Sequence, residues 1–486
     1  MLSELEAGQY IFERHKMEKA DIGMVGLGVM GSNLALNIAE KGYTVAVYDR
    51  DEPVLKAFLE KAGDLIDKII PCATFEQLAD NIRKPRPFIF LIKAGAPVDA
   101  ETTRLKALLE KGDIMIDAGN SDYRDTVRRL NALGPNDPTF VGMGVSGGAE
   151  GARHGPSMMV GGTPEAYERI APVLLAAAAK YKDEHCCALV GPDGAGHFVK
   201  TIHNGIEYAD MQMIAEIYGI LRDGLGLSAP AIGDVFEKWN GGPLDSYLIE
   251  ITAAVLKATD PESGKALVDI ILDEAGQKGT GRWAAIEAET LGVPATTIEA
   301  AVAARSISSL KGERAEAAKA YAPAPRTLDI ADHTKFLLDL EQALLAGKIA
   351  AYAQGFAVMQ AASKEHGWNI PLATTARIWR AGCIIRSQLL DDIAHAFEGN
   401  ENRNLLLAPA FVTRMQKASQ GLRDLVAKAA LAGLPVPALA SALNYFDSYT
   451  QPLGTANLIQ GQRDFFGSHG FKRIDKDGDF HGPWNA

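Results

Sequence analysis

Short apolar runs alternate with amphipathic stretches along the first part of the chain. Five runs have the length and the β-branched or aromatic content of buried strands, at residues 21–25, 44–48, 88–93, 114–117 and 139–145. Between them, stretches such as 33–41 and 100–111 carry apolar residues at helical spacing. Regular alternation of strands and helices is typical of a parallel, doubly wound sheet. We therefore predict an α/β, Rossmann-like domain over residues 21–195.

The pattern changes after about residue 195. Over residues 196–450, Ala, Leu, Ile and Glu recur at helical spacing and strand-like runs nearly vanish, which predicts a large all-helical domain. Residues 236–242 resemble residues 376–382, and each follows a long amphipathic stretch, so we interpret this domain as an internal duplication. Chance similarity of two Trp-containing helix ends is the alternative. The period is lost over residues 451–486, where we expect an extended tail.

Composition and charge limit the class of protein. The net charge of −12 argues against nucleic acid or an anionic membrane as a partner. No apolar stretch is long enough to span a membrane. Residues 1–20 are too acidic for a signal peptide, so we expect this leader to be a short helix or a frayed extension. The four cysteines lack zinc-ligand spacing and suit a reducing compartment, which predicts a cytoplasmic protein without a metal site.

A glycine-rich turn follows the first predicted strand. The turn has the sequence GLGVMG and contains Gly26, Gly28, Met30 and Gly31. Such glycines permit a tight turn, close approach of a pyrophosphate and close packing of the next helix, whose N-terminus favours an anion. Lys93 and Asn120 each follow another predicted strand, at the edge where open α/β sheets bind ligands. These features predict a dinucleotide site, although Lys93 and Asn120 are equally compatible with plain turns.

Four polar residues share one face of the helix predicted for the stretch FVKTIHNGIEY. They are spaced at i, i+3, i+4 and i+7 and comprise Lys200, His203, Asn204 and Glu207. An amine, an imidazole, an amide and a carboxyl group together can supply a general base, a general acid and two hydrogen-bonding groups. The alternative is an ordinary solvated helix face.

Shorter clusters suit an anionic ligand. Residues 146–148, Ser-Gly-Gly, end a predicted strand and can form a nest for a carboxylate or an oxyanion. Residues 277–281, QKGTG, suit a phosphate, although exposed turns explain both clusters. Arg305 lies in an otherwise small and apolar helical stretch and needs an anionic partner, either a ligand phosphate or a protein carboxylate. Solvated surface is the default interpretation for Arg463 and His469 in the tail.

These motifs occur together, and in this order, in a known family. From about residue 20 to its C-terminus, the chain resembles the decarboxylating 6-phosphogluconate dehydrogenases. The resemblance rests on GLGVMGSNLALNIAEKGY, LIKAG, DAGNSDYRDT, GVSGGAEGARHGPSMMVGG, FVKTIHNGIEYADMQ, QKGTGRW, ARSISSLKGER and IQGQRDFFGSH. It implies that the chain converts 6-phospho-D-gluconate to D-ribulose 5-phosphate and CO₂ in the pentose phosphate pathway, with NADP or NAD and without a metal.

The resemblance also implies a role for each motif residue. Lys200 would be the general base and Glu207 the general acid. Substrate hydroxyls and the carboxylate would be held by Asn120, Ser146, Gly147, Gly148, His203 and Asn204. The phosphate would be held by Tyr208, Lys278, Thr280 and Arg305, and by Arg463 and His469 from the partner subunit of a homodimer with exchanged tails. The coenzyme would contact Gly26, Gly28, Met30, Gly31, Asp49, Arg50, Lys93 and Asn120.

The end of the second predicted strand departs from this family. The family usually has Asn-Arg-Thr or Asn-Arg-Ser where this chain has Asp49, Arg50 and Asp51. Asp49 lies 23 positions after Gly26, where a carboxylate accepts a hydrogen bond from the ribose 2′-hydroxyl of NAD. Arg50 can pair with the 2′-phosphate of NADP, but two carboxylates repel that group. The family default is NADP, so we predict that both coenzymes are used, with NAD much better than is usual.

Two other functions are compatible with part of the pattern. Enzymes of the 3-hydroxyisobutyrate dehydrogenase type share the glycine motif, the Ser-Gly-Gly and a helix lysine, but they are shorter. They would not need Glu207, Arg305 or the tail. A non-catalytic coenzyme-binding protein would not need both Lys200 and Glu207.

Overall fold

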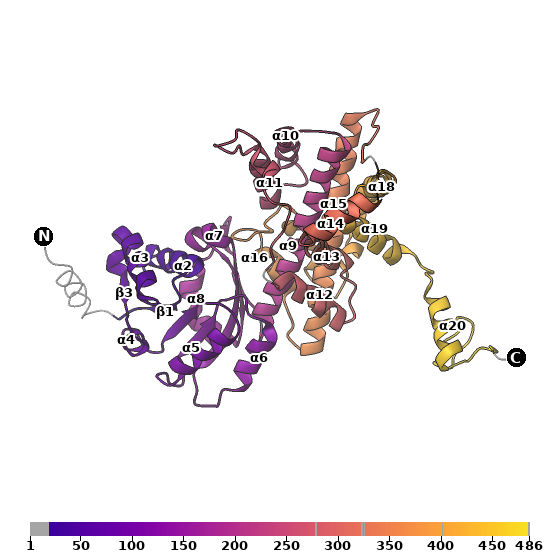
Figure 1. Ribbon diagram of the computed structural model, residues 1–486. Coiled ribbons are helices and arrows are strands. Elements are labelled where there is room, and N and C mark those ends of the chain that lie inside the picture. Colours follow the sequence, from indigo (N-terminus) through magenta and orange to yellow (C-terminus); the bar gives the residue numbers. More distant parts are fainter. Residues whose placement is uncertain (1–18, 278, 322–323, 325, 401, 485–486) are drawn as a thin grey trace.

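The first half of the chain folds around an eight-stranded sheet with helices on both faces (Figure 1). The computed structural model describes residues 19–277, 279–321, 324, 326–400 and 402–484. The strands are β1 (Ile22–Val25), β2 (Val45–Tyr48), β3 (Ile69–Pro71), β4 (Pro87–Phe90), β5 (Ile114–Asp117), β6 (Thr139–Ser146), β7 (Ser157–Gly161) and β10 (Cys187–Gly191). They lie in the order β10-β7-β6-β5-β4-β1-β2-β3. A separate hairpin joins β8 (Lys180–Tyr181) to β9 (Glu184–His185).

The five predicted strands are present as β1, β2, β4, β5 and β6, which are parallel to one another in the sheet. Three strands of this sheet were not predicted, nor were the two short strands of the hairpin. β3 ends in a proline at the sheet edge, and β7 and β10 contain few β-branched residues, so each has a weak strand signal. β7 pairs antiparallel with β6, and β10 runs parallel to β7. The two strands at this end of the sheet therefore run in the opposite direction to the other six.

Helices cover the two faces of this sheet and bury two separate apolar cores. They are α2 (Val29–Glu40), α3 (Glu52–Ala62), α4 (Phe75–Asp80), α5 (Ala96–Lys106), α6 (Tyr123–Asn131), α7 (Gly148–His154) and α8 (Pro164–Ala177), with a 3₁₀ turn at Gly63–Lys68. One core contains side chains of α2 and α8, and the other contains side chains of α4 and α5. Coverage of both faces confirms the predicted doubly wound α/β domain.

The second half is helical, as predicted, and is built around α9 (Ala195–Gly219) and α15 (His333–His366), which pack against each other. The other helices are α10 (Ala229–Trp239), α11 (Tyr247–Lys257), α12 (Thr280–Thr290), α13 (Thr296–Ser308), α14 (Lys311–Tyr321), α16 (Leu372–Ile378), α17 (Leu389–Phe397), α18 (Pro409–Ala432) and α19 (Pro437–Thr450). Shorter turns of helix lie at Ile220–Gly224, Leu267–Asp269 and Leu405–Leu407. None of the helices within the described residues is long and apolar enough to cross a membrane.

The first turns of α9 pack directly on β6 and β7. A side chain at Gly144 of β6 would clash with Cβ of Lys200, and one at Gly161 of β7 would lie 2.5 Å from the backbone nitrogen of Gly196. Glycine at these positions lets the helix approach the sheet closely. This packing fixes the polar stripe of α9 against the end of β6.

The two segments that echo each other in sequence have the same order of elements. The long helix α9 is followed by α10 and α11, and the long helix α15 is followed by α16 and α17. An antiparallel bridge joins Ser246, just before α11, to Ser387, just before α17. Descent from one duplicated unit stays a prediction.

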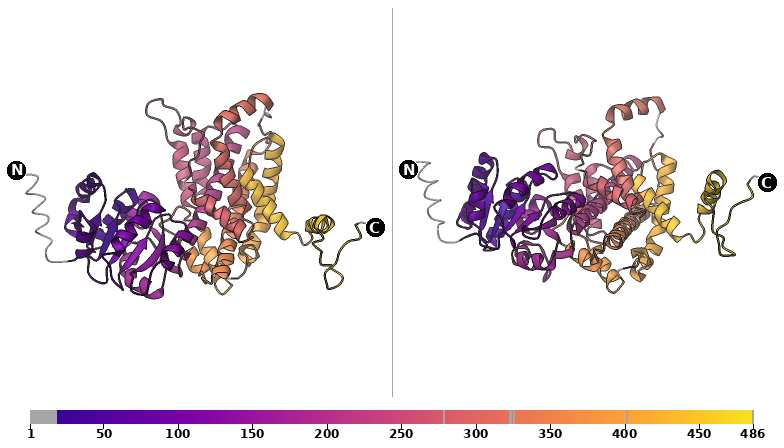
Figure 2. Two further views of the ribbon diagram at one scale, coloured as in Figure 1. Left: turned by 60° about the horizontal axis from the view of Figure 1, so that its bottom comes forward. Right: turned by 90° about the horizontal axis from the view of Figure 1, so that it is seen from below.

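The C-terminal tail leaves the body of the protein after α19 (Figures 1 and 2). It is not extended throughout as expected, because it contains α20 (Ala456–Gly467). The buried Asp464 carboxylate accepts hydrogen bonds from the backbone nitrogens of Gly470 and Gly482, each at 2.8 Å, and from Nε1 of Trp484 at 2.7 Å. This local ring of donors organises a stretch that has no apolar period. The leader expected at residues 1–20 lies almost wholly outside the described residues.

Candidate functional site

The four polar residues on one face of α9 are buried rather than solvated. The alternative interpretation, an ordinary solvated helix face, was therefore wrong. Lys200 is only 6% exposed, His203 is fully buried and Asn204 is buried, while the Glu207 side chain is 19% exposed. A buried amine and a buried imidazole on one helix cost free energy unless they are paired or serve a purpose. The structure therefore places Lys200, His203, Asn204 and Glu207 together in one largely buried polar cluster.

Hydrogen bonds connect the members of this stripe to two other elements. Nζ of Lys200 lies 3.4 Å from Nδ1 of His203, which in turn lies 3.1 Å from Oδ1 of Asn204. Nε2 of His203 lies 3.3 Å from Oγ of Ser146, at the end of β6. Nδ2 of Asn204 donates to Oγ1 of Thr280, at the start of α12, at 2.9 Å. Three predicted site segments thus meet around one imidazole.

Burial sets the protonation of the three titratable groups. Burial lowers the pKa of Lys200, and the nearby Glu207 opposes this only in part. Burial and the neighbouring Lys200 hold the pKa of His203 well below its usual range, so the imidazole is neutral at neutral pH. Burial raises the pKa of Glu207, against the attraction of Lys200 and Arg305 and with the help of Asp210. An amine shifted towards its neutral form and a carboxyl shifted towards its acid form match a general base and a general acid.

The next turn of α9 faces α12 and α13 and forms the cationic side of the site. The Arg305 guanidinium carbon lies 3.5 Å from the centre of the Tyr208 ring, a cation–π contact. Arg305 also donates to the backbone oxygen of Gly276 at 3.3 Å. Gly279, with φ of +98°, ends the preceding turn, and Thr280 begins α12. Within the described residues, Arg305 makes no ion pair with a protein carboxylate, which favours the ligand anion in our prediction.

Lys278, the remaining residue predicted for the phosphate, lies outside the described residues.

The Ser-Gly-Gly turn closes the opposite side of the imidazole. Gly147 and Gly148 have φ of +117° and +61°, values that favour glycine. A side chain at Gly147 would lie 2.6 Å from the backbone oxygen of Gly382. Trp379 packs edge-on against His203, with ring centres 5.4 Å apart. In the sequence, the segment around Trp379 and Gly382 was interpreted only as part of an internal duplication. Its position beside His203 and Gly147 was not predicted.

The glycine-rich turn has the shape required for a dinucleotide. Gly26 has φ of +93°, and a side chain there would lie 2.7 Å from the backbone oxygen of Leu91. A side chain at Gly31 would clash with the backbone of Gly26, whereas the space around Gly28 is open. Gly28 caps the N-terminus of α2 and is exposed. Two glycines therefore serve packing, and the third leaves room for a phosphate beside free helix amides, with Met30 in the first turn of α2.

The three residues after β2 behave differently from one another. The Asp49 carboxylate accepts from the backbone nitrogen of Leu27 at 2.7 Å and from that of Asp51 at 3.0 Å. It thereby braces the glycine-rich turn, a role that the sequence pattern did not predict. Arg50 and Asp51 are exposed beside this turn.

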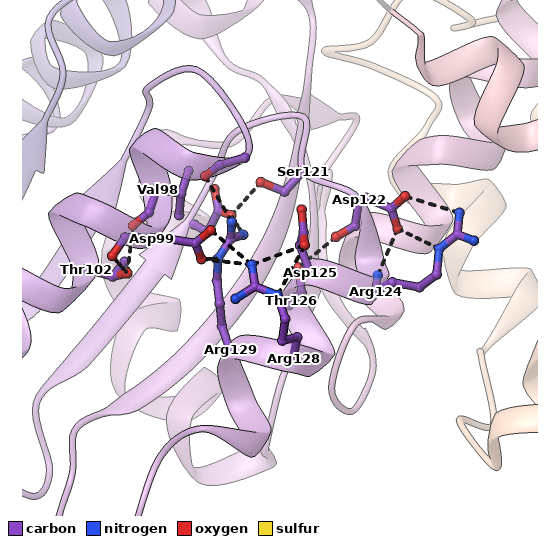
Figure 3. A network of polar contacts seen from close by, with 12 residues as sticks. Val98, Asp99, Thr102, Ser121, Asp122, Arg124, Asp125, Thr126, Arg128 and Arg129 are labelled. Atoms are coloured by element: carbon purple, nitrogen blue, oxygen red, sulfur yellow. Dashed lines mark hydrogen bonds and ion pairs between the residues drawn. The ribbon is translucent and has the colours of Figure 1, made fainter.

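A buried network fixes the two loops that carry Lys93 and Asn120 (Figure 3). Asp117, the last residue of β5, accepts from Oγ of Ser121 at 2.6 Å and from the backbone nitrogen of Gly119 at 3.0 Å. Arg129 of α6 donates to Asp117 and to the backbone oxygen of Gly95, each at 3.2 Å, and its Nε donates to Asp99 at 2.8 Å. Lys93 and Asn120 stay exposed at the sheet edge. An aspartate at the end of a predicted strand, here Asp117, could have indicated this network from the sequence alone. Nothing in the sequence pattern identified Arg129 as its partner.

Arg463 and His469 are not part of this site within one chain. Both are exposed on the tail, which projects away from the body (Figure 2). Apolar side chains beside them, such as Leu458, Phe465 and Phe466, are also exposed. Among the described residues, no group of three or more His, Cys, Asp or Glu side chains is arranged to hold a metal ion.

Comparisons with known proteins cover both halves of the chain. Residues 21–191 match the family described as the NAD binding domain of 6-phosphogluconate dehydrogenase, and residues 196–484 match its C-terminal domain. A decarboxylating 6-phosphogluconate dehydrogenase of Schizosaccharomyces pombe is 49% identical over 96% of this chain and 97% of that protein. The enzyme of Escherichia coli is 47% identical over 96% of this chain and 100% of that protein.

Two further relatives differ in their coenzyme. A Bacillus subtilis protein named 6-phosphogluconate dehydrogenase, NAD(+)-dependent, decarboxylating, is 45% identical over 96% of this chain and 99% of its own. A solved structure of the Plasmodium falciparum enzyme, described with NADP+ and with 6-phosphogluconate, has a TM-score of 0.93 at 41% identity, covering 96% of this chain and 100% of that one.

Proposed function

The chain belongs to the family of decarboxylating 6-phosphogluconate dehydrogenases, and from this premise we propose how its residues divide the reaction among them. The enzyme oxidises and decarboxylates 6-phospho-D-gluconate, giving ribulose 5-phosphate and CO₂, with NAD(P) as the coenzyme. Similarity over nearly the full length, at 45–49% identity, excludes the 3-hydroxyisobutyrate dehydrogenase type and a non-catalytic protein. The observation that carries the residue assignment is the buried Lys200, with Glu207 two turns further along the same helix.

Lys200 acts as the general base. Its burial favours the neutral amine, which takes the proton of the C3 hydroxyl as the C3 hydrogen leaves as hydride. The coenzyme, when bound, accepts that hydride. The resulting β-keto acid loses its carboxylate because the C3 carbonyl accepts the electron pair, and the protonated Lys200 stabilises that oxygen by donating to it.

Glu207 acts as the general acid. Seven residues of helix separate it from Lys200, a rise of about 10 Å, so the two groups serve different carbons of the substrate. Its raised pKa keeps it protonated closer to neutral pH, and it protonates C1 of the enediol left by CO₂. The neutral His203, held between Lys200, Asn204 and Ser146, orients substrate hydroxyls without adding a charge.

Substrate anions bind at the two ends of this site. Asn120, Ser146, Gly147 and Gly148 hold the carboxylate end, and Tyr208, Thr280 and Arg305, with Lys278, hold the phosphate. Arg463 and His469 complete the phosphate site of a partner subunit in a homodimer. The exposed apolar side chains of the tail support this exchange, because they gain a buried surface only by docking elsewhere. Removing residues 451–486 should raise the substrate KM sharply and weaken dimerisation, and an unchanged dimer with unchanged KM would disprove the exchange.

The coenzyme preference follows from the residues after β2. Gly26, Gly28, Met30 and Gly31, with Lys93 and Asn120, hold a dinucleotide of either kind. Asp49 and Asp51 add two carboxylates beside Arg50, which disfavours a 2′-phosphate. We expect both coenzymes to be used, with NAD much better than is usual for the family. Asp49→Asn combined with Asp51→Thr should shift preference towards NADP at least about tenfold, equal to about 1.4 kcal/mol. Strict NADP use by the parent would disprove this.

The pathway and the location follow from the reaction. We assign the enzyme to the pentose phosphate pathway in the cytoplasm, where its four free and buried cysteines stay reduced. One assay tests the function: purified protein is given 6-phosphogluconate with NADP or NAD, and absorbance at 340 nm is followed while CO₂ is measured. Reduced coenzyme and CO₂ should form in equal amounts. Coenzyme reduction without CO₂, or no reduction, would contradict the assignment.

A further inference from the structure

A buried carboxylate joins the helical half of the protein to the coenzyme domain. Glu287 of α12 has a side chain that is only 2% exposed. Its Oε2 accepts a hydrogen bond from the hydroxyl of Tyr123 at 3.0 Å, and its Oε1 lies 2.8 Å from Nη2 of Arg124. The Arg124 contact is an ion pair without the alignment of a hydrogen bond. Tyr123 and Arg124 begin α6, which belongs to the sheet domain.

The helix that carries Glu287 also begins the phosphate side of the site. Thr280, seven residues earlier and about 10 Å away along α12, accepts from Asn204 of α9. The same face of α12 packs tightly on α9, because a side chain at Gly205 would lie 2.6 Å from Cβ of Ala284 and one at Gly281 would clash with the Tyr208 ring. Since interiors packed at this density resist sliding, α12 and α9 behave as one rigid unit.

Beyond Arg124, the contacts of Glu287 lead to the loop that carries Asn120. The Asp122 carboxylate caps α6 by accepting from the backbone nitrogen of Arg124 at 2.9 Å, and it pairs with Nε of the same guanidinium at 3.1 Å. The loop itself is held from the other side by Asp117, through Gly119 and Ser121 (Figure 3). The Arg124 guanidinium therefore contacts both Asp122, next to the loop that carries Asn120 (the coenzyme loop), and Glu287 of α12, the helix that begins at Thr280.

We propose that Glu287 is a positioning residue that sets the distance between the coenzyme loop and the substrate site. Its carboxylate is buried, and its charge is compensated by donors from the other domain, so only one placement of α6 against α12 satisfies it. That placement fixes Asn120 relative to Asn204 and Thr280, and hence the hydride acceptor relative to C3. This inference rests on the proposed function of Asn120 and Thr280.

Glu287→Gln tests the inference, because the amide oxygen still accepts from Tyr123 while the charge that attracts Arg124 is lost. The matched control is Glu289→Gln, which removes the same charge from an exposed position of the same helix. The Kd values of NADP, NAD and 6-phosphogluconate, each bound alone, should stay within about twofold of the parent. The turnover number kcat should fall about tenfold or more, because misplacement of reacting groups slows the chemical step. The control should keep the parent's kcat.

A double-mutant cycle with Arg124→Met shows whether the effect passes through the ion pair. Each single variant should lower kcat, and the double variant should lose no more than the worse single one. A kcat for Glu287→Gln equal to that of Glu289→Gln, or a loss proportional only to the unfolded fraction in a melting experiment, would overturn the proposal. The variant Asn120→Ala distinguishes a failure of the proposed site from a failure of the positioning role of Glu287. If it leaves ligand binding and kcat unchanged, the proposed site fails; if it impairs them while Glu287→Gln does not, only the positioning role fails.

Discussion

Two buried lysines, Lys200 on α9 and Lys348 packed against α9, differ in how their burial is compensated. Lys348, reaching from α15, lies 2.8 Å from Oδ2 of Asp210, and both side chains are 4% exposed. Lys200 is about as buried, yet within the described residues it forms no ion pair, and its nearest polar partner is the neutral His203 at 3.4 Å. The charge of Lys348 is compensated by its partner, whereas burial lowers the pKa of Lys200 and shifts it towards the neutral amine.

The comparison distinguishes a lysine suited to a structural role from a lysine suited to proton transfer. The Lys348–Asp210 ion pair compensates a charge that burial disfavours. An unpaired buried lysine gives up its proton more readily, which a general base needs and a structural residue does not. In our proposal, α9 therefore carries the catalytic lysine and, about three turns further along, the carboxylate of a structural ion pair.

The largest effect is expected when the unpaired lysine is removed. Lys200→Met should abolish both dehydrogenation and decarboxylation, with a loss of about 10²–10⁴ in rate or more, because His203 beside it is a much weaker base, its pKa being held well below the usual range. Coenzyme reduction and CO₂ release are the two readouts. Lys200→Met turning over near the parent rate would show that the base is another group.

Removing the acid should impair only the last step. Glu207→Gln keeps the shape of the side chain but cannot donate a carboxyl proton, so protonation at C1 should slow by about 10²–10³, while hydride transfer and CO₂ release continue better than in Lys200→Met. Exchange of solvent tritium into C1 of ribulose 5-phosphate measures this step directly. Equal tritium exchange in parent and variant would remove Glu207 from its assigned role.

The paired lysine should behave in the opposite way. Lys348→Met leaves the Asp210 carboxylate buried without its cation, which typically costs about 3–5 kcal/mol of folding stability. Denaturant unfolding measures this loss, and adding Asp210→Asn should recover much of it. Because this pair does not touch the substrate in our assignment, kcat should change far less than in Lys200→Met. A Lys348→Met protein as stable as the parent would remove the contrast between the two lysines.

The smallest effect is a gain of stability where activity is lost. The folded state lowers the pKa of Lys200, so the unfolded chain binds more protons and the cost of burying this amine grows as pH falls from the unfolded towards the folded pKa. Lys200→Met removes that cost, and its melting temperature should exceed the parent's by a few degrees, more at neutral than at alkaline pH. A lower melting temperature at neutral pH would mark Lys200 as a stabilising residue.

Local spacing made much of this architecture readable from the sequence. The i, i+3, i+4, i+7 pattern predicted four polar groups on one face, and the glycine turn after β1 predicted a coenzyme-binding domain, because both signals depend on residues close together in the chain. The pattern could not show that the polar face is buried, since its cover comes from β6 and α12, far away in the sequence. The Asp210–Lys348 pair and the Glu287 contacts were missed for the same reason, as was the bracing role of Asp49. The helix in the tail was missed because donors around Asp464, rather than an apolar period, hold it together.

The most direct test is to titrate Lys200 itself. Heteronuclear NMR of protein carrying isotope-labelled lysine, with Lys200→Met used for assignment, reports the protonation of this amine as pH is raised. The account predicts that Lys200 loses its proton at a pH below the model-peptide value of about 10.4. A Lys200 signal that titrates at or above that value would contradict the assignment of this residue as a base made available by burial.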